Sequence, residues 1–366
     1  MNEQATSVPT AIQRLIQASL HKQGGWLPFD RFMALALYAP GLGYYSARQS
    51  QIGRMPESGS DFVTAPEISK YFGLTLARSV HEAMLHTDTQ EVFEFGAGNG
   101  TMALQLLDAL GDTVHRYTIV DLSGELRERQ AQTLQAHVNK VQWVTELPEH
   151  INGVVLGNEV LDAMPVRLLQ RISGAWHERG VVWAEEQQAF AWQDRVTSER
   201  PPMEMDGDHD YLCEIHPQAE AFVRSVGERL QQGAMFLIDY GFPEHEYYHP
   251  QRHMGTLMCH QAHQSDSNPL IHVGEKDITA HVNFTGVALA AQDVDLQVLG
   301  YTSQAHFLIN SGLLPLLENA SVPERAMAQK LILDHEMGEL FKVIALGPGE
   351  PWTPMGFSQA DRSHRL

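Results

Sequence analysis

The sequence predicts an α/β fold built around a mostly parallel sheet. Two observations support this prediction: short apolar strands alternate with helical segments in the first half of the chain, and a glycine-rich turn joins one of these strands to a helix. Such alternation places helices over the faces of a parallel sheet. The chain has 366 residues, 43% of them hydrophobic, which is enough for one large α/β domain with an appended or inserted subdomain.

The N-terminal part is predicted to be a helical cap. Apolar residues recur at helical spacing over Thr10–Leu37, and Gly24–Pro28 divides this stretch into two amphipathic helices. Glycines and serines are frequent over Pro40–Thr64, which indicates a long loop that is either functional or disordered. A further helix is expected over Ile68–Leu85. Residues 1–90 are therefore predicted to form an N-terminal helical cap and loop.

Strands and helices alternate in the next part of the chain. The predicted elements are, in order, Glu91–Phe95, Thr101–Leu110, Tyr117–Asp121, Gly124–Val138, Val141–Val144 and Val154–Gly157. This βαβαββ order implies parallel strands.

The C-terminal half is predicted to continue the sheet around an insertion. Met235–Asp239 is typical of a central strand and Phe341–Ala345 of a final one. The His-rich segment Pro243–His281 has weak periodicity and is predicted to be a large insertion. Residues 91–366 would then form one domain with an insertion around 243–284. The other expected elements are antiparallel strands at Trp176–Trp183 and Ala189–Trp192, and helices at Gln218–Gln231, Ala288–Leu299, Gln304–Ser311 and Arg325–Leu333.

The charge balance narrows the range of partners. The chain has 25 Lys plus Arg and 45 Asp plus Glu, a formal net charge of −20 that is spread along the sequence. This argues against a nucleic-acid backbone as a partner, whereas a basic peptide or an arginine-bearing protein would be attracted. The oligomeric state is not predicted.

The sequence also indicates a soluble protein in a reducing compartment. No stretch contains eighteen consecutive apolar residues, which argues against a membrane span. The only cysteines, Cys213 and Cys259, are far apart, so we expect inert or buried thiols and no disulfide framework. The first residues show neither an export signal nor a transit pattern, and we therefore expect a cytoplasmic location.

The strongest local signal is a glycine-rich turn between an apolar strand and a helix. A dinucleotide fingerprint requires G-x-G-x-x-G, with the helix N-terminus facing a pyrophosphate. Here the glycines are Gly96, Gly98 and Gly100, so the third comes one residue early and Thr101 occupies its position. S-adenosylmethionine (SAM) carries no phosphate, and its loop need only leave room for the adenosyl and methionyl groups. Glu94 could accept from the cofactor's ammonium group. Taken alone, the turn could also be a plain strand-to-helix connection.

A second signal is Asp121, which ends a predicted strand about 25 residues after the glycine turn. Its carboxylate could accept from both ribose hydroxyls of the cofactor. Such an acid also serves nicotinamide cofactors, so it supports the fold more than the chemistry. Asp121 could equally cap the following helix.

A third signal is Asn158–Pro165, which places an amide and two acids just beyond the fourth strand. In an open α/β sheet this is the crevice where a substrate meets the cofactor. Glu159 and Asp162 could hold a guanidinium bidentately and leave one of its nitrogens aimed at the methyl group. The alternative is a capped helix start with solvated acids.

The sequence resembles the MidA-like methyltransferases over nearly its whole length, from about Ile12 to Leu346. The blocks that carry the resemblance are Tyr38–Tyr45, Asp61–Ser69, the glycine turn, Asn158–Pro165, Asp239–Gly241 and Gly274–Phe284. The resemblance implies a Rossmann-like class I methyltransferase sheet with an N-terminal helical cap and an inserted segment, with SAM as cofactor. Because the mitochondrial member is a protein arginine methyltransferase, it also implies a protein substrate that presents arginine.

Site residues follow from the resemblance position by position. The expected cofactor-binding residues are Glu94, Gly96, Gly98, Gly100, Asp121, Pro66 and Glu67. Asn158, Glu159 and Asp162 are expected to face the methyl group as catalytic residues, and Asp239 to close the floor of the site. The sequence departs from the family at Asp121, where glutamate is common, but aspartate keeps the bidentate acceptor.

The His-rich insert and two tyrosines are further candidates. His245, His249 and His253 have i, i+4 spacing and could bind a metal if they lay on one helix. Prolines interrupt that segment, so we predict no metal. Tyr44 and Tyr45, in the glycine-rich loop, could contact a guanidinium through cation–π interactions.

Two other functions remain open at this point. A small-molecule methyltransferase of the same fold would have a small, closed acceptor pocket. An assembly or chaperone factor could retain the SAM pocket without turnover.

Overall fold

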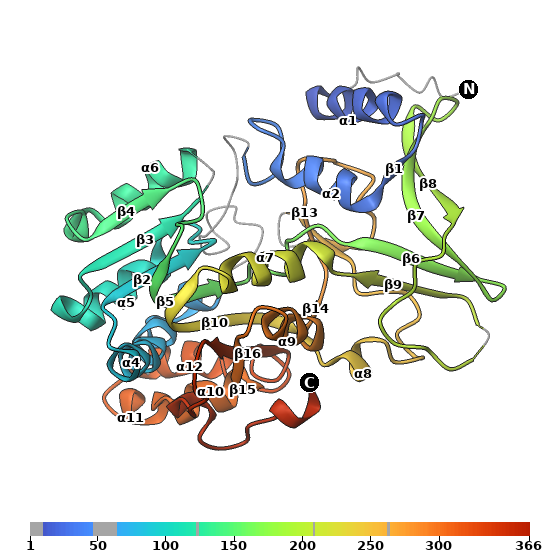
Figure 1. Cartoon of the computed structure of the whole chain (residues 1–366). Coiled ribbons are helices and arrows are strands. Elements are labelled where there is room, and N and C mark those ends of the chain that lie inside the picture. Colours follow the sequence, from blue (N-terminus) through green and yellow to red (C-terminus); the bar gives the residue numbers. More distant parts are fainter. Residues whose placement is uncertain (1–9, 47–63, 122–123, 208, 262–263) are drawn as a thin grey trace. The chain divides into compact units, whose positions relative to one another are not determined.

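The computed structural model describes residues 10–46, 64–121, 124–207, 209–261 and 264–366, which form two compact units (Figure 1). Unit 1 comprises Met1–Ser50, Ala163–Gln218 and His245–Ala280, and unit 2 comprises Gln51–Asp162, Ala219–Glu244 and His281–Leu366. These units do not meet at the predicted boundary, residue 90. The first two helices of the chain share a core with strands from residues 163–218, which are distant in sequence.

Unit 2 contains an eight-stranded sheet in the order β15-β16-β10-β5-β2-β3-β4, with β14 paired to β10. The pairs β10–β5, β5–β2, β2–β3 and β3–β4 are parallel, whereas β16 is antiparallel to both β10 and β15. The predicted mostly parallel, Rossmann-like sheet is therefore confirmed. The strands are β2 (Glu91–Phe95), β3 (Arg116–Val120), β4 (Val141–Val144), β5 (Ile151–Asn158), β10 (Leu230–Phe242), β14 (Val282–Asn283), β15 (Gln297–Ser303) and β16 (Phe341–Gly347).

Helices pack on this sheet because its strands are apolar on both faces. On one face, Val92 of β2 and Phe236 of β10 share a buried core with Leu76 of α4. On the other, the ring of Phe95 lies 5.0 Å from that of Phe222 in α7. The unit 2 helices are α3 (Ala65–Ile68), α4 (Lys70–Thr87), α5 (Thr101–Leu110), α6 (Gly124–Thr133), most of α7 (Pro217–Gly227), α9 (Phe284–Gln292), α10 (Gln304–Asn310), α11 (Leu313–Leu317) and α12 (Val322–Lys330).

The helix predicted over Ala288–Leu299 is wrong in its second half. The helix ends at Gln292, and Gln297–Ser303 forms the edge strand β15. Asp295 adopts a left-handed conformation with φ +61°, which ends the helical path, and Leu296 and Leu299 had mimicked helical spacing. The sheet thereby gains an antiparallel edge.

Unit 1 has its own sheets. A five-stranded sheet has the order β1-β7-β6-β9 with β8 paired to β7, and a three-stranded sheet has the order β12-β11-β13. The predicted antiparallel strands are confirmed as β7 (Ala175–Ala184) and β8 (Ala189–Val196), but they extend this separate sheet, since they pair with unit 1 strands only. The remaining elements are α1 (Ala11–Lys22), α2 (Phe29–Tyr38), most of α8 (Glu244–Tyr247), β1 (Leu27–Pro28), β6 (Arg167–Ile172), β9 (Tyr211–Ile215), β11 (Met258–Gln261), β12 (Gln264–Asp266) and β13 (Asp277–Thr279).

The core of unit 1 explains why the cap helices belong to it. Ile16 of α1 and Phe32 of α2 are fully buried against Leu168 of β6 and Val181 of β7. Each such large apolar side chain contributes about 1.5–3 kcal/mol when it leaves water. None of the helices in the described ranges is both long enough and apolar enough to cross a membrane.

Candidate functional site

The glycine turn has a backbone conformation that favours glycine at three positions. Gly96, Gly98 and Gly100 have φ values of +66°, +53° and +86°, in the left-handed region that other residues rarely adopt. A Cβ atom at Gly96 would also lie 2.7 Å from Cγ2 of Val160, which is too close. These glycines let the chain turn tightly from β2 into α5.

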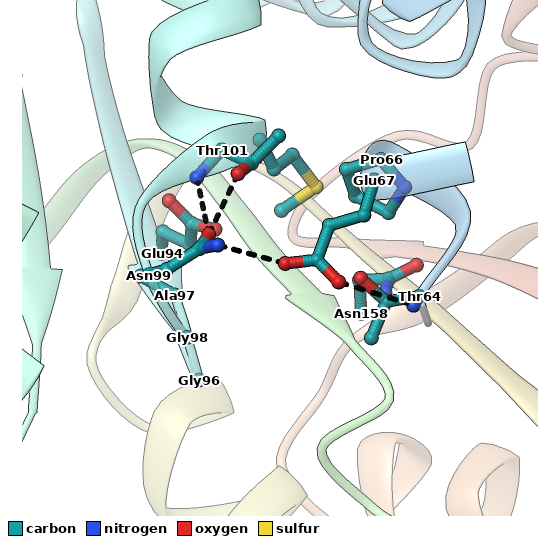
Figure 2. Close-up of a pocket in the computed structure, with 11 residues that line it drawn as sticks. Thr64, Pro66, Glu67, Glu94, Gly96, Ala97, Gly98, Asn99, Thr101 and Asn158 are labelled. Carbon is teal, nitrogen blue, oxygen red and sulfur yellow. Dashed lines mark hydrogen bonds between the residues drawn. The ribbon is translucent and has the colours of Figure 1, made fainter. Parts of the chain in front are cut away.

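A pocket opens beside this turn, and its empty volume of about 370 Å³ includes space that is open to solvent. It lies at the carboxyl ends of β2 and β5, where open α/β sheets bind ligands (Figure 2). The pocket brings together six predicted site residues: Pro66, Glu67, Glu94, Gly96, Gly98 and Asn158. Thr64, Ala97, Asn99, Thr101 and Met102 complete its lining.

Glu67 ties the α3 segment to the glycine turn. Figure 2 shows its side chain extending between Thr64 and Asn99. One carboxylate oxygen accepts from Nδ2 of Asn99 at 2.8 Å, and Asn99 in turn accepts from the backbone N–H of Thr101 at 3.0 Å. Burial raises the pKa of Glu67 above its usual value. Asn99 was not predicted, although its place between the loop glycines could have marked it.

Glu94 forms a buried carboxyl in the pocket wall. Its side chain is 1% exposed and accepts a hydrogen bond from the hydroxyl of Tyr117 at 2.7 Å. Burial raises the pKa of Glu94 to about 7. This carboxyl would be readily ionised by a cationic ligand, because a nearby positive charge favours the charged form.

Two predicted cofactor residues lie outside the pocket lining. Gly100 precedes α5 as its N-cap, and Asp121 follows β3 at the neighbouring strand end. Asp121 accepts a hydrogen bond from Gln130 at 2.8 Å.

A group of carboxyls lies just after β5 and within β10. Glu159 is half-buried in a left-handed conformation, with φ +53°, and Oε1 accepts from Nδ2 of Asn158 at 3.2 Å. A non-glycine residue in this conformation is strained by about 1–3 kcal/mol, and residues strained in this way cluster at functional sites. Burial, and then the neighbouring charge of Asp162, raise the pKa of Glu159 to about 8.

Asp239 holds the turn that carries these groups. Its Oδ2 accepts from the backbone N–H groups of Val160, Leu161 and Asp162 at 3.2, 2.9 and 3.3 Å. The Tyr240 hydroxyl donates to Oδ2 of Asp162 at 2.5 Å. Despite the three backbone donors to Asp239, burial raises the pKa of this carboxyl well above its usual value. The predicted floor residue is thus 1% exposed beneath the Asn158–Asp162 turn.

The raised pKa values predict a pH-dependent stability. Glu94 and Glu159 have pKa values of about 7 and about 8 in the folded state, against an ordinary 4.5. Such groups stabilise the fold fully below their unfolded pKa, and this contribution is lost as the pH rises through the folded pKa. Urea unfolding should therefore show stability falling between about pH 5 and pH 9, by roughly 3 kcal/mol for Glu94 alone.

Replacing Glu94 with glutamine provides the control for this prediction. The amide can still accept from Tyr117 but does not titrate in this range. The variant should show a flatter pH dependence, and an unchanged slope would exclude Glu94 as its source. Glu324 and Asp112, whose pKa values are lowered by hydrogen bonds to Lys70 and Lys140, titrate below this range.

The other candidates belong to unit 1. The histidine series does not share a helix, because α8 ends at Tyr247, before His249 and His253. Residues 47–63 of the predicted long loop lie outside the described residues. Within the described parts of the chain, no group of three or more His, Cys, Asp or Glu side chains could hold a metal ion.

Tyr44, Tyr45 and the cysteines are also in unit 1. Tyr44 is 4% exposed in its core, and the Tyr45 hydroxyl donates to Oδ1 of Asp277 at 2.7 Å. Cys213 and Cys259 are buried free thiols, as predicted.

Comparisons with known proteins agree on one family. A family model described as "Putative S-adenosyl-L-methionine-dependent methyltransferase" matches residues 75–302. A crystal structure from Burkholderia thailandensis, described as a "likely methyl transferase" bound to S-adenosyl-homocysteine, is 45% identical, with a TM-score of 0.92 over 98% of this chain and 100% of that chain. A native structure from the same organism is 44% identical, with a TM-score of 0.88 over the same shares of the two chains.

Curated relatives have a more specific name. The mitochondrial protein arginine methyltransferase NDUFAF7 of Mus musculus is 28% identical, over 89% of this chain and 82% of its own length. The protein of the same name from Homo sapiens is 27% identical, over 95% of this chain and 86% of its own length.

Proposed function

This chain belongs to the MidA-like family of SAM-dependent methyltransferases, and on that premise we propose that it methylates an arginine side chain of a protein. The names of the curated relatives support the arginine acceptor, and the carboxyl groups beside the pocket support it independently.

The pocket residues fit the cofactor. The glycines of the pocket leave room for a ligand. Oδ1 of Asn158 is a buried acceptor that has no hydrogen-bond partner among the described residues. Together with the Glu94 carboxyl, it would accept hydrogen bonds from an ammonium group. SAM supplies a reactive methyl group on its sulfonium. The residues assigned to hold it are Glu94, Gly96, Gly98, Gly100, Asp121, Pro66 and Glu67.

The observation that carries the arginine assignment is the carboxyl-rich turn. Neither Glu159 nor Asp239 forms an ion pair with a lysine or arginine within the described ranges. Besides burial, the charge of Asp162 raises the pKa of Glu159, and the charges of Asp162 and Glu159 raise the pKa of Asp239. The cluster therefore favours an incoming positive charge. A guanidinium is charged at physiological pH, and its planar donors match carboxylates bidentately.

The roles of the side chains follow from this charge. Glu159 and Asp162 bind the guanidinium and localise its charge on one nitrogen, which leaves another nitrogen aligned for in-line attack on the methyl carbon. With SAM bound, its sulfonium would supply the methyl group to this nitrogen and leave as S-adenosylhomocysteine, and Glu159 would accept the proton that the nitrogen releases. A pKa of about 8 before binding suits a group that accepts a proton near neutral pH. Asn158 orients Glu159, and Asp239 supports the turn.

Methyl-labelled SAM tests this proposal directly. The purified protein is incubated with a lysate from cells that lack it, the proteins are separated from small molecules, and the protein fraction is hydrolysed in acid. Label should be recovered as methylarginine. Label in another amino acid or in the small-molecule fraction would refute the arginine acceptor, and no transfer at all would favour an assembly factor without turnover.

A further inference from the structure

A buried glutamine on α6 links three parts of unit 2 beside the glycine turn. Gln130 is 0% exposed, and its Nε2 donates to the backbone carbonyl of Gly98 at 3.0 Å and to Oδ2 of Asp121 at 2.8 Å. Its Oε1 accepts from Nε1 of Trp143 at 2.9 Å. The partners come from the glycine turn, the end of β3 and the edge strand β4 (Figure 1).

These partners permit only one orientation of the amide. The indole N–H of Trp143 can only donate, whereas the Gly98 carbonyl and the ionised Asp121 carboxylate can only accept. A flipped amide would place its NH₂ group against the indole N–H and its oxygen against two acceptors. The orientation of Gln130 is therefore fixed by chemistry, and each of its two N–H groups serves one acceptor.

We infer that Gln130 is a positioning residue, which sets the Asp121 carboxylate and the glycine turn in one arrangement for the ribose of the cofactor. This inference rests on the cofactor role proposed for Asp121. The bond to Asp121 restricts rotation of the carboxylate, and the bond to Gly98 restrains a residue in a left-handed conformation. The α6 backbone is also close, since a Cβ at Gly100 would lie 3.5 Å from Cα of Gln130.

The test compares two ligands in the Gln130→Leu variant. Calorimetry measures the affinity for S-adenosylhomocysteine and for its analogue without the 2′ and 3′ ribose hydroxyls. We expect binding of S-adenosylhomocysteine to weaken by about 10- to 100-fold, as for the loss of a hydrogen bond to a charged group. The analogue should lose much less affinity, because it makes no ribose contact with Asp121.

Gln304→Leu is the matched control. Gln304 is also 0% exposed in unit 2, and it donates to the backbone carbonyl of Leu331 at 2.9 Å. Its loss should reduce stability without changing ligand affinity. Gln130→Glu tests the polarity argument, because it retains the size and the acceptor for Trp143 but places an acceptor against Asp121. This variant should bind S-adenosylhomocysteine at least as weakly as Gln130→Leu.

Two outcomes would overturn the inference. In the first, Gln130→Leu binds both ligands as the wild type does. In the second, it loses equal affinity for both ligands, and this second result would indicate a purely structural role. The Asp121→Ala variant distinguishes failure of the positioning role of Gln130 from failure of the cofactor role proposed for Asp121. Unchanged affinity in Asp121→Ala would refute the ribose site itself, whereas weakened binding there with wild-type binding in Gln130→Leu would refute only the positioning role.

Discussion

Replacing Glu159 with alanine should leave SAM binding nearly unchanged and reduce methyl transfer by at least about 100-fold. In the proposed mechanism Glu159 binds the guanidinium and takes its proton, so its loss removes both charge stabilisation and alignment. The measurement pairs calorimetry with SAM and steady-state transfer of labelled methyl groups to the protein fraction. Unchanged turnover would remove Glu159 from the mechanism.

Glu159→Gln and Glu220→Gln refine this result. The first keeps the size and the acceptor for Asn158 but cannot take the proton, so transfer should remain low. The second neutralises another half-buried glutamate of unit 2, which pairs with Arg224 on α7. Transfer in Glu220→Gln should stay near the wild-type rate, because Glu220 has no part in the site.

Replacing Gly98 with valine should weaken SAM binding by at least about 100-fold. Gly98 has φ +53° in the pocket wall, and a β-branched residue in this conformation is strained by about 1–3 kcal/mol. Relief of that strain would move the turn, and the added side chain would crowd the pocket. Calorimetry with SAM measures the effect, and retained affinity would contradict the placement of the cofactor at this turn.

Gly111→Val separates strain from crowding. Gly111 has φ +52° at the other end of α5, and a Cβ there would have no atom within 4 Å. The substitution should therefore reduce stability through its backbone alone. SAM affinity of the folded Gly111→Val protein should match the wild type, which would assign the loss in Gly98→Val to the pocket.

The sheet around the glycine turn could be predicted because its signals are local. The strand Glu91–Phe95, the helix Thr101–Leu110 and the strand Val141–Val144 have the predicted bounds, since apolar periodicity and glycines determine them over a few residues. Pocket residues on the same strand ends could be predicted for the same reason. The carboxyl ends of parallel strands meet at one edge of a sheet.

The two units could not be predicted from local pattern. β6 and β9 pair with each other across residues 173–210, and their sheet also includes β1 from the N-terminal part. Gln130 was also missed, because nothing in its neighbouring sequence marks it. Its three partners meet only when the turn, β3 and β4 are folded.

A crystal structure of this protein with S-adenosylhomocysteine would test the central claim most directly. We expect the ligand in the pocket beside Gly98, with its ribose hydroxyls at the Asp121 carboxylate and its sulfur directed toward Asn158 and Glu159. That orientation would place the transferred methyl group at the carboxyl-rich turn. A ligand bound elsewhere, or with its sulfur directed away from Glu159, would contradict the proposed site.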